Sequence, residues 1–373
     1  MADYKGIKGF KVQYLSADPS NPIVGQTWYN STSKDLKYTG VTTASSWATG
    51  NNMNTARSVL AGAGTQTAAL GFGGNAAPGA TGATEEYNGA TWTTSPPGLN
   101  TARGSLAGAG TQTAALAFGG TGPPFTGATE EYNGATWTSN PTGLNTVRRQ
   151  LAGAGIQTAA LAFGGDLPTA TGATEEYDGT NWTSVNSMNT ARRQLAGCGI
   201  QTAGLAFGGG DPGVFSATEE YNGTSWTTSP GSLNTARQGL GGAGTQTAAL
   251  GFGGQTPATT GATEEYNGAT WTSSPASLAT ARYELGGAGT QLAALAFGGY
   301  TGTAKTGATE EYDGSTWTTS PASLATVRSS FGGAGTQASA LAFGGSDSGD
   351  AVTAATEEWT GAGAPLTKTI TVS

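Results

Sequence analysis

Short runs of small and apolar residues alternate with runs of threonine, serine and asparagine along most of the chain. The stretch LAGAGTQTAALAFGG at residues 106–120 predicts two short strands joined by a tight turn. Two further strands are predicted over residues 128–132 and 136–138, joined by Asn133 and Gly134, which suit the positive φ angles of a type I′ hairpin. No segment has a sustained apolar period of 3.6 residues. The pattern predicts an all-β chain of four-stranded antiparallel sheets.

This four-strand pattern occurs seven times, with a period of 44 to 46 residues. Each copy has a Gly-Gly pair after an apolar run, and the pairs begin at Gly73, Gly119, Gly164, Gly208, Gly253, Gly298 and Gly344. A Thr-Glu-Glu-aromatic group follows, and in six copies its Tyr precedes a Trp by five residues, as Tyr132 precedes Trp137. Aromatic residues in constant register argue against a disordered low-complexity chain. Repeats of this length copy one supersecondary unit, which buries its apolar face only against its neighbours.

The repeat resembles the kelch repeat in its apolar run LAFGG at residues 116–120, its EEY at 130–132, its Trp137, and Arg148 at the opening of the next unit. The resemblance covers about residues 47–360 and implies a seven-bladed β-propeller domain, to which we assign residues 41–360. The seventh copy lacks the second Trp, whereas Trp47 precedes the first copy with no unit ahead of it. We therefore expect a strand around Trp47 to complete the last blade, which would leave no free sheet edge.

Composition excludes several kinds of chemistry. The chain of 373 residues has no histidine and one cysteine, so it offers no Ser-His-Asp or Cys-His pair, no His-ligated metal and no internal disulfide. We predict no catalytic residues, no metal and no cofactor. A net charge of -8 argues against nucleic acid as a partner. The chain contains no apolar run of about 18 residues, so membrane insertion is not expected. Charged residues are only 11% of the chain, so its surface is predicted to be neutral and rich in hydroxyl groups.

Residues 1–40 differ in composition from the repeats. Five of the seven lysines lie here against three aspartates, which gives this segment a charge of +2 and leaves about -10 for the remainder. The sequence DPSNP at residues 18–22, GQTWYN at 25–30 and DLKY at 35–38 resembles a short β-hairpin motif of bacteriophage tail-fibre and other virion proteins. The resemblance implies a small β segment that attaches the chain to a virus particle. In the C-terminal tail, residues 361–373, the stretch 367–372 alternates like a strand, and we expect it to pair with residues 9–14.

The seven Glu-Glu pairs hold 14 of the 24 acidic residues. Paired carboxylates suit general acid-base catalysis or a calcium site. Each copy also supplies one arginine at a fixed offset, and an active site would ordinarily break the symmetry of the repeat. We therefore interpret the Glu and Arg residues as seven equivalent contacts that hold the blades together. Cys198 replaces an alanine of the first strand and is predicted to be a small buried apolar residue.

The loop after each Gly-Gly pair varies between copies that are otherwise nearly identical. Loops on a rigid scaffold commonly carry binding residues. Three aromatic residues in these loops suit stacking on a sugar or an apolar patch, and three charged residues could hydrogen-bond hydroxyl groups; the six are Phe125, Phe215, Tyr300, Asp166, Asp211 and Lys305. The alternative, tolerated loop drift with Pro and Gly as turn formers, remains open.

These features favour a bacteriophage virion structural protein of tail-fibre or appendage type, not an enzyme. Its expected partners are other virion proteins, through the N-terminal segment, and a host-surface glycan or protein, through the loops. Assembly is expected in the host cytoplasm, because the first residues lack the apolar core of a secretory signal. A non-adhesive capsid or tail decoration and, with less support, a glycan-active enzyme are the alternatives. A homo-oligomer is compatible with the sequence.

Overall fold

A computed structural model describes residues 12–20, 22–41, 44–122, 124–363 and 365–370. The chain forms two compact units, one of residues 47–358 and one from the described parts of 1–46 and 359–373. The described residues form strands, turns and loops. None of them lies in a helix long and apolar enough to cross a lipid bilayer.

Each of the seven repeats contributes two N-terminal strands rich in Gly and Ala. The first strands are β5 (Ala61–Thr65), β11 (Ala107–Gly110), β15 (Ala152–Ile156), β19 (Ala196–Ile200), β23 (Gly241–Thr245), β27 (Gly286–Gly289) and β31 (Gly332–Gly335). The second strands are β6 (Ala68–Phe72), β12 (Ala115–Phe118), β16 (Ala159–Phe163), β20 (Ala203–Phe207), β24 (Ala248–Phe252), β28 (Ala294–Phe297) and β32 (Ser339–Phe343). The first repeat also has a small hairpin of β7 (Asn75–Ala76) and β8 (Gly79–Ala80).

Two further strands complete each sheet and carry the larger aromatic residues. The third strands are β9 (Thr84–Tyr87), β13 (Thr129–Tyr132), β17 (Thr174–Tyr177), β21 (Thr218–Tyr221), β25 (Thr263–Tyr266), β29 (Thr309–Tyr312) and β33 (Thr356–Thr360). The fourth strands are β10 (Trp92–Thr94), β14 (Trp137–Ser139), β18 (Trp182–Val185), β22 (Trp226–Thr228), β26 (Trp271–Ser273), β30 (Trp317–Thr319) and β4 (Ser46–Thr49). The five-residue spacing of Tyr and Trp places Tyr132 directly opposite Trp137 across the hairpin.

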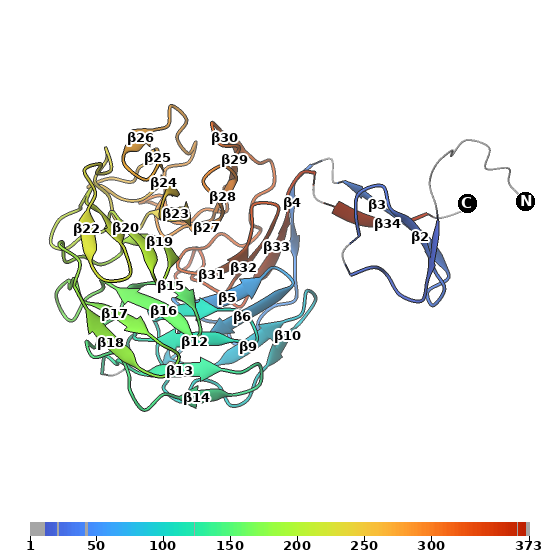
Figure 1. Cartoon of the computed structure of the whole chain (residues 1–373). Helices are drawn as coiled ribbons and strands as arrows, with labels where there is room; N and C mark the ends of the chain where they lie inside the picture. The colour runs from blue at the N-terminus through green and yellow to red at the C-terminus, as the bar shows by residue number, and fades with distance from the viewer. Residues whose placement is uncertain (1–11, 21, 42–43, 123, 364, 371–373) are drawn as a thin grey trace, which may run out of the picture. The chain divides into compact units, whose positions relative to one another are not determined.

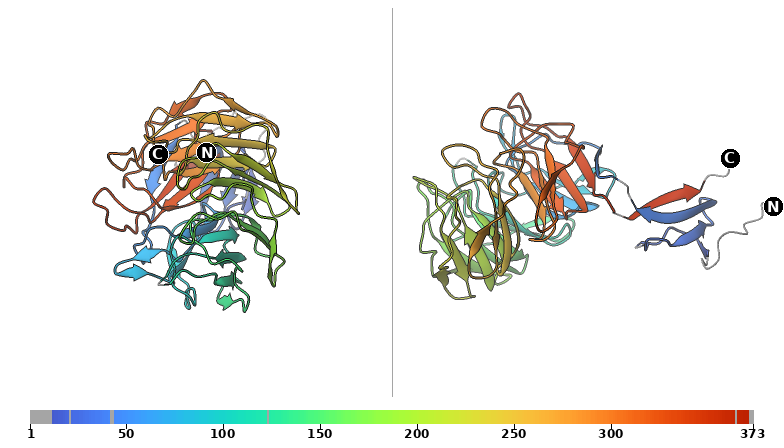
Figure 2. Two further views of the ribbon diagram at one scale, coloured as in Figure 1. Left: turned by 90° about the vertical axis from the view of Figure 1, so that its left-hand side faces the viewer. Right: turned by 90° about the horizontal axis from the view of Figure 1, so that it is seen from above.

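These strands form seven four-stranded sheets, which we number from first to seventh by their first strands in chain order. Figure 1 and the two views of Figure 2 show the sheets following one another around a common centre, with β31 beside β5. The prediction of an all-β chain with repeated four-stranded antiparallel sheets is confirmed. The arrangement is compatible with a multi-bladed β-propeller.

In most of the first strands, one glycine is required by the preceding sheet. A Cβ atom on Gly108 would lie 2.7 Å from the ring of Phe72, which comes from the second strand of the first sheet. Real Cβ atoms do not approach other atoms so closely, so only glycine lets the two sheets pack at this distance. The same contact joins Gly62 of the first sheet to Phe343 of the seventh, at 2.8 Å.

Aromatic side chains fill the space between neighbouring sheets. Trp137 is 4% exposed, its ring lies 5.1 Å from that of Phe72, and its Nε1 donates to Thr84 Oγ1 at 2.8 Å. Trp92 makes the same two contacts with the seventh sheet, at 5.1 Å from Phe343 and 2.8 Å to Thr356. The first and seventh sheets therefore pack together as consecutive sheets do.

The seventh sheet takes its fourth strand from the chain before the repeats. Its order is β31-β32-β33-β4, so Trp47 occupies the place of the missing second Trp. Trp47 Nε1 donates to Thr309 Oγ1 at 2.8 Å, and its ring lies 5.3 Å from Phe297. The Gly50 N–H donates to the Thr356 carbonyl at 2.9 Å, as Asn140 does to Thr129 at 2.8 Å. The chain therefore enters β4 and leaves β33 at the same end of this sheet.

The second unit is a sheet of order β1-β2-β3-β34, made of β1 (Gln13–Leu15), β2 (Thr27–Asn30), β3 (Asp35–Val41) and β34 (Pro365–Ile370). The expected pairing of the C-terminal tail with residues 9–14 is wrong for its described part. β34 pairs antiparallel with β3, while Gln13 and Tyr14 pair in parallel with β2. Residues 9–11 lie outside the described residues. β34 and β1 are the two edge strands of this sheet, so β2 and β3 separate the tail from residues 13–15.

Asp18 organises the segment that resembles virion proteins. Its carboxylate accepts hydrogen bonds from Trp28 Nε1 at 2.9 Å, from Asn30 Nδ2 at 2.7 Å and from Lys37 Nζ at 2.7 Å. These hydrogen bonds lower the pKa of Asp18 to about 2, and the one from Lys37 makes the largest contribution. The spacing of Asp18, Trp28, Asn30 and Lys37 is thus explained by one carboxylate that joins a loop to β2 and β3.

Candidate binding face

A buried ion pair lies in every repeat sheet. The arginine that opens each repeat contacts the first glutamate of the Glu-Glu pair, at 2.7 Å between Arg148 and Glu175. All seven pairs are at most 2% exposed: Arg57–Glu85, Arg103–Glu130, Arg148–Glu175, Arg192–Glu219, Arg237–Glu264, Arg282–Glu310 and Arg328–Glu357. Burial lowers the pKa of Arg57 to about 10, against the opposing effect of the Glu85 charge.

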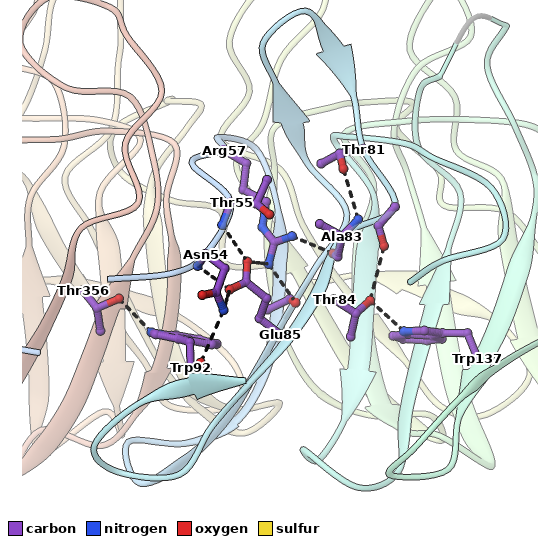
Figure 3. A network of polar contacts seen from close by, with 12 residues as sticks. Asn54, Thr55, Arg57, Thr81, Ala83, Thr84, Glu85, Trp92, Trp137 and Thr356 are labelled. Carbon is purple, nitrogen blue, oxygen red and sulfur yellow. Dashed lines mark hydrogen bonds and ion pairs between the residues drawn. The ribbon is translucent and has the colours of Figure 1, made fainter. Parts of the chain in front are cut away.

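The ion pair fastens the segment leading into a sheet to the third strand of the same sheet (Figure 3). Glu85 accepts from the backbone N–H groups of Asn54 at 2.5 Å and Thr55 at 3.1 Å. Arg57 donates to the carbonyls of Ala83 at 2.7 Å and Gly71 at 3.1 Å. With its oxygens occupied and shielded from water, Glu85 is placed for a structural role rather than for proton transfer. The seven pairs are equivalent, as expected, but each acts within its own sheet.

In six of the seven pairs, the second glutamate accepts a hydrogen bond from a tyrosine of the next sheet. The Tyr132 hydroxyl donates to Glu86 Oε1 of the preceding sheet at 2.5 Å, and Tyr221 donates to Glu176 at 2.8 Å. The same bond joins Tyr87 to Glu358, which links the first sheet to the seventh. Burial raises the pKa of Tyr132 to about 12, and the hydrogen bond to Glu86 makes the second-largest contribution to this rise.

We expect Tyr132 to ionise later than an ordinary tyrosine, whose pKa is about 10. Because the folded-state pKa is the higher one, the stabilisation by this hydroxyl is fully present below about pH 10 and is lost as the pH rises through about 12. Ultraviolet absorbance of tyrosinate during an alkaline titration measures the pH at which tyrosines ionise. The difference spectrum between wild type and Tyr132→Phe isolates the contribution of Tyr132. Glu86→Gln should shift the transition to lower pH. Ionisation of Tyr132 at the same pH in the folded and the guanidinium-unfolded chain would contradict this expectation.

The variable residues gather at one end of the sheets. There, the residue after each opening arginine forms a two-way backbone bridge with the start of the variable loop after the second strand. The seven bridges are Ser58–Asn75, Gly104–Thr121, Arg149–Asp166, Arg193–Gly210, Gln238–Gln255, Tyr283–Tyr300 and Ser329–Ser346. We call this end of the sheets the variable end. It presents a different pair of side chains from each repeat on the same backbone frame.

Backbone hydrogen bonds between neighbouring sheets support the variable end. The next residue along each repeat has a left-handed backbone; the seven are Val59, Ser105, Gln150, Gln194, Gly239, Glu284 and Ser330, with φ between 46° and 60°. In five of the seven, all but Gln194 and Ser330, the N–H group donates to the carbonyl of the equivalent residue in the preceding sheet, as from Ser105 to Val59 at 2.9 Å. Val59 of the first repeat donates to Ser330 of the seventh at 2.9 Å.

Val59 is the one β-branched residue among these seven, and a positive φ is most costly for that type of side chain. Val59→Asn is expected to raise the free energy of unfolding by about 1 kcal/mol, because asparagine tolerates the left-handed region. Chemical denaturation followed by circular dichroism measures the change. Val59→Ala keeps a Cβ atom and serves as the control, with a smaller gain expected. A loss of stability in Val59→Asn would show that the valine side chain outweighs the backbone strain.

Two arginines and two aspartates form a charge network across the third and fourth repeats. Asp166 is 1% exposed and accepts from Arg149 Nε at 3.2 Å and from Arg193 Nη1 at 3.1 Å. Arg193 also lies 3.7 Å from Asp211, and the Arg149 guanidinium lies 4.8 Å from the centre of the Phe125 ring. The structure thus brings Phe125, Asp166 and Asp211 together through the two arginines. The charges compensate one another, and the side chains of Arg149 and Arg193 remain about one-third exposed.

An open hollow of about 360 Å³ lies across the sixth, seventh and first repeats. We call it the tyrosine hollow, and its lining is Ser58, Val59, Tyr283, Glu284, Tyr300, Lys305, Ser329, Ser330, Ser346 and Asp350. Tyr300 and Lys305, two of the six predicted residues, are therefore brought together here. Lys305 Nζ donates to Ser346 Oγ, to the Asp347 carbonyl and to Asp350, each at 2.6 Å. Phe215, the last of the six, is half-buried in the loop after β20.

Sequence reasoning missed the other half of each bridge. Tyr283 and Glu284 line the tyrosine hollow, and Arg149 and Arg193 hold the charge network. None of these four was predicted as a binding residue, because the prediction considered only the loops after the Gly-Gly pairs. A signal was present, because the two residues after each opening arginine vary between copies as much as the loops do: SV, GS, RQ, RQ, QG, YE and SS. Cys198 is partly buried against the core between the fourth and fifth sheets, and burial raises its pKa to about 12.

Neither the models of known protein families nor the curated proteins match this chain. Its function therefore has to be argued from the sequence and the geometry of the variable end.

Proposed function

We propose that this protein is a bacteriophage virion structural protein of tail-fibre or appendage type, whose variable end adheres to a glycan or protein on the host surface. The observation that carries the proposal is the position of the sequence variation. In seven nearly identical units, differences collect in the bridge residues and loops of one end, where they line a hollow and a charge network. Residues that only maintain the fold would be expected to repeat there, as the ion pairs do.

The scaffold is proposed to be a closed seven-bladed β-propeller of kelch type. Three contacts between the first and seventh sheets support closure: Gly62 with Phe343, Trp92 with Thr356, and the Val59 N–H with the Ser330 carbonyl. The fourth strand supplied by β4 would seal the ring by joining the beginning of the repeat array to its end. A sealed ring has no free sheet edge, which suits a protein that stands exposed on a particle surface.

The small sheet of β1, β2, β3 and β34 is proposed to attach the protein to other virion proteins. Its support is the resemblance of residues 18–38 to virion proteins and the Asp18 network that gives this motif a defined structure. The chain enters β4 and leaves β33 at the end of the seventh sheet opposite its variable loop. Both connections to the small sheet are therefore made away from the variable end.

A non-adhesive decoration or spacer is the second candidate, and one observation favours it. Asp166 and Lys305, two residues expected to meet a ligand, already have protein partners for their charges. A glycan-active enzyme has less support, because the repeated first glutamates are buried and ion-paired in every sheet.

Electron microscopy of intact particles, labelled with an antibody against residues 47–358, tests the virion assignment. Label on a tail fibre or appendage is expected, and unlabelled particles would refute the assignment.

Adhesion is tested with purified chain as a competitor of particle adsorption to host cells. The triple variant Phe125→Ala, Phe215→Ala, Tyr300→Ala should lose the competition while keeping its circular dichroism spectrum. Wild-type chain that does not compete would favour the decoration or spacer.

A further inference from the structure

The tyrosine hollow differs from the rest of the variable end in combining aromatic rings with an uncompensated carboxylate. We propose that it binds a saccharide unit that carries no negative charge. This inference rests on the proposed adhesive function and deepens it by naming the site and the class of ligand. Saccharide sites pair an apolar platform with a few polar groups in a concave surface. The hollow offers each of these features.

The platform is the Tyr283–Tyr300 pair. These residues donate backbone hydrogen bonds to each other, at 3.0 Å and 2.8 Å, so both side chains project from one rigid bridge. Their rings meet edge to face with centroids 5.5 Å apart, and both remain half-buried rather than covered. Tyrosine offers a broad apolar face and a hydroxyl at low conformational cost. No other bridge has two aromatic residues.

Glu284 sets the charge of the hollow. Its Oε2 accepts from Ser330 Oγ at 2.7 Å, and a serine hydroxyl brings no positive charge to the carboxylate. Among the described residues, no lysine or arginine forms an ion pair with it. Lys305, the cation of the hollow, is neutralised by Asp350 at 2.6 Å and is 8% exposed. The net charge is therefore negative, which favours the hydroxyl donors of a neutral sugar or the ammonium of an amino sugar and repels a sialic or uronic acid.

Serine hydroxyls complete the lining. Ser58 of the first repeat brings a hydroxyl donor and acceptor, and Ser330 of the seventh, whose proton is donated to Glu284, brings an acceptor. The charge network of the third and fourth repeats lacks this combination, because its two aspartates form ion pairs with its two arginines. The hollow is thus the part of the variable end best suited to a polar, uncharged ring.

The test is an array of immobilised oligosaccharides grouped as neutral, amino-sugar and acidic, probed with the full chain. Binding is expected to neutral or amino-sugar members and not to acidic ones. The double variant Tyr283→Ala, Tyr300→Ala should weaken that binding by about ten-fold or more. Its matched control is Gln238→Ala, Gln255→Ala, which truncates the same two backbone positions in the fifth repeat and should change binding less than about two-fold.

The outcomes separate this inference from the proposed function. Preference for acidic oligosaccharides, or equal loss in both double variants, overturns the saccharide site in the hollow. Binding lost in Arg149→Ala, Arg193→Ala but kept in the tyrosine variant moves the site to the charge network and leaves adhesion standing. If no oligosaccharide binds, the hollow proposal fails, and competition with particle adsorption decides independently whether the chain adheres to host protein.

Discussion

Replacing Trp137 by alanine is expected to lower the free energy of unfolding by about 3–5 kcal/mol. The indole fills the space between the first and second sheets, in contact with the rings of Phe72 and Tyr132 at 5.1 and 5.0 Å. Its Nε1 also satisfies Thr84 Oγ1. Truncation would leave a cavity that the rigid sheets cannot collapse to fill. Guanidinium denaturation measures the loss, with Thr138→Ala, an exposed neighbour on the same strand, as the control.

The same replacement at Trp47 tests closure of the ring. Trp47 precedes the repeats but makes the contacts of a fourth-strand Trp, with Thr309 and Phe297. In a closed propeller, Trp47→Ala should cost nearly as much stability as Trp137→Ala. Its indole is half-buried, so a somewhat smaller loss is expected. A negligible loss would mean that the N-terminal strand does not hold the last sheet in solution.

Glu175→Gln is expected to cost about 3–5 kcal/mol of stability, because it leaves the charge of Arg148 buried without a counter-charge. Arg148 and Glu175 are both fully buried and lie 2.7 Å apart. The glutamate also accepts from the N–H groups of Asn145 at 2.6 Å and Thr146 at 3.1 Å, so the lead-in segment of the sheet would loosen as well.

The matched control is Glu176→Gln, the same change one residue further along β17 and on its opposite face. Glu176 accepts a hydrogen bond from Tyr221 at 2.8 Å and is only half-buried, so a loss of about 1 kcal/mol is expected. Thermal melting of both variants at neutral pH provides the comparison. Equal losses at the two positions would show that burial of the ion pair is not what makes Glu175 important.

Much of the fold could be predicted because the same strand pattern occurs seven times in the sequence. The five-residue spacing of Tyr132 and Trp137 corresponds to a hairpin whose ends face each other, as the pairing of β13 and β14 shows. The unmatched Trp47 pointed to the strand that completes the seventh sheet. Local patterns of this kind survive in the folded protein because they depend on strand geometry and on turns of a few residues.

The partners of individual charged and aromatic side chains could not be predicted in this way. Asp166 is neutralised by arginines from two different repeats, and Lys305 reaches Asp350 of the following repeat. The tail strand β34 pairs with β3 because a sheet edge was available there, which alternation within the tail does not reveal. These outcomes depend on segments that meet only after the sheets have packed.

The amino-acid sequence by itself determined the strand pattern and the sevenfold repeat, because every copy carries the same local information. Only the tertiary structure decided which variable residues share a surface. Tyr283 and Tyr300 are 17 residues apart in the chain, and Ser58 lies in another repeat, yet all three line one hollow. The two tyrosines meet in one backbone bridge of the sixth repeat, and Ser58 comes near them because the seventh sheet packs between the sixth and the first, an arrangement of distant segments that no local pattern encodes.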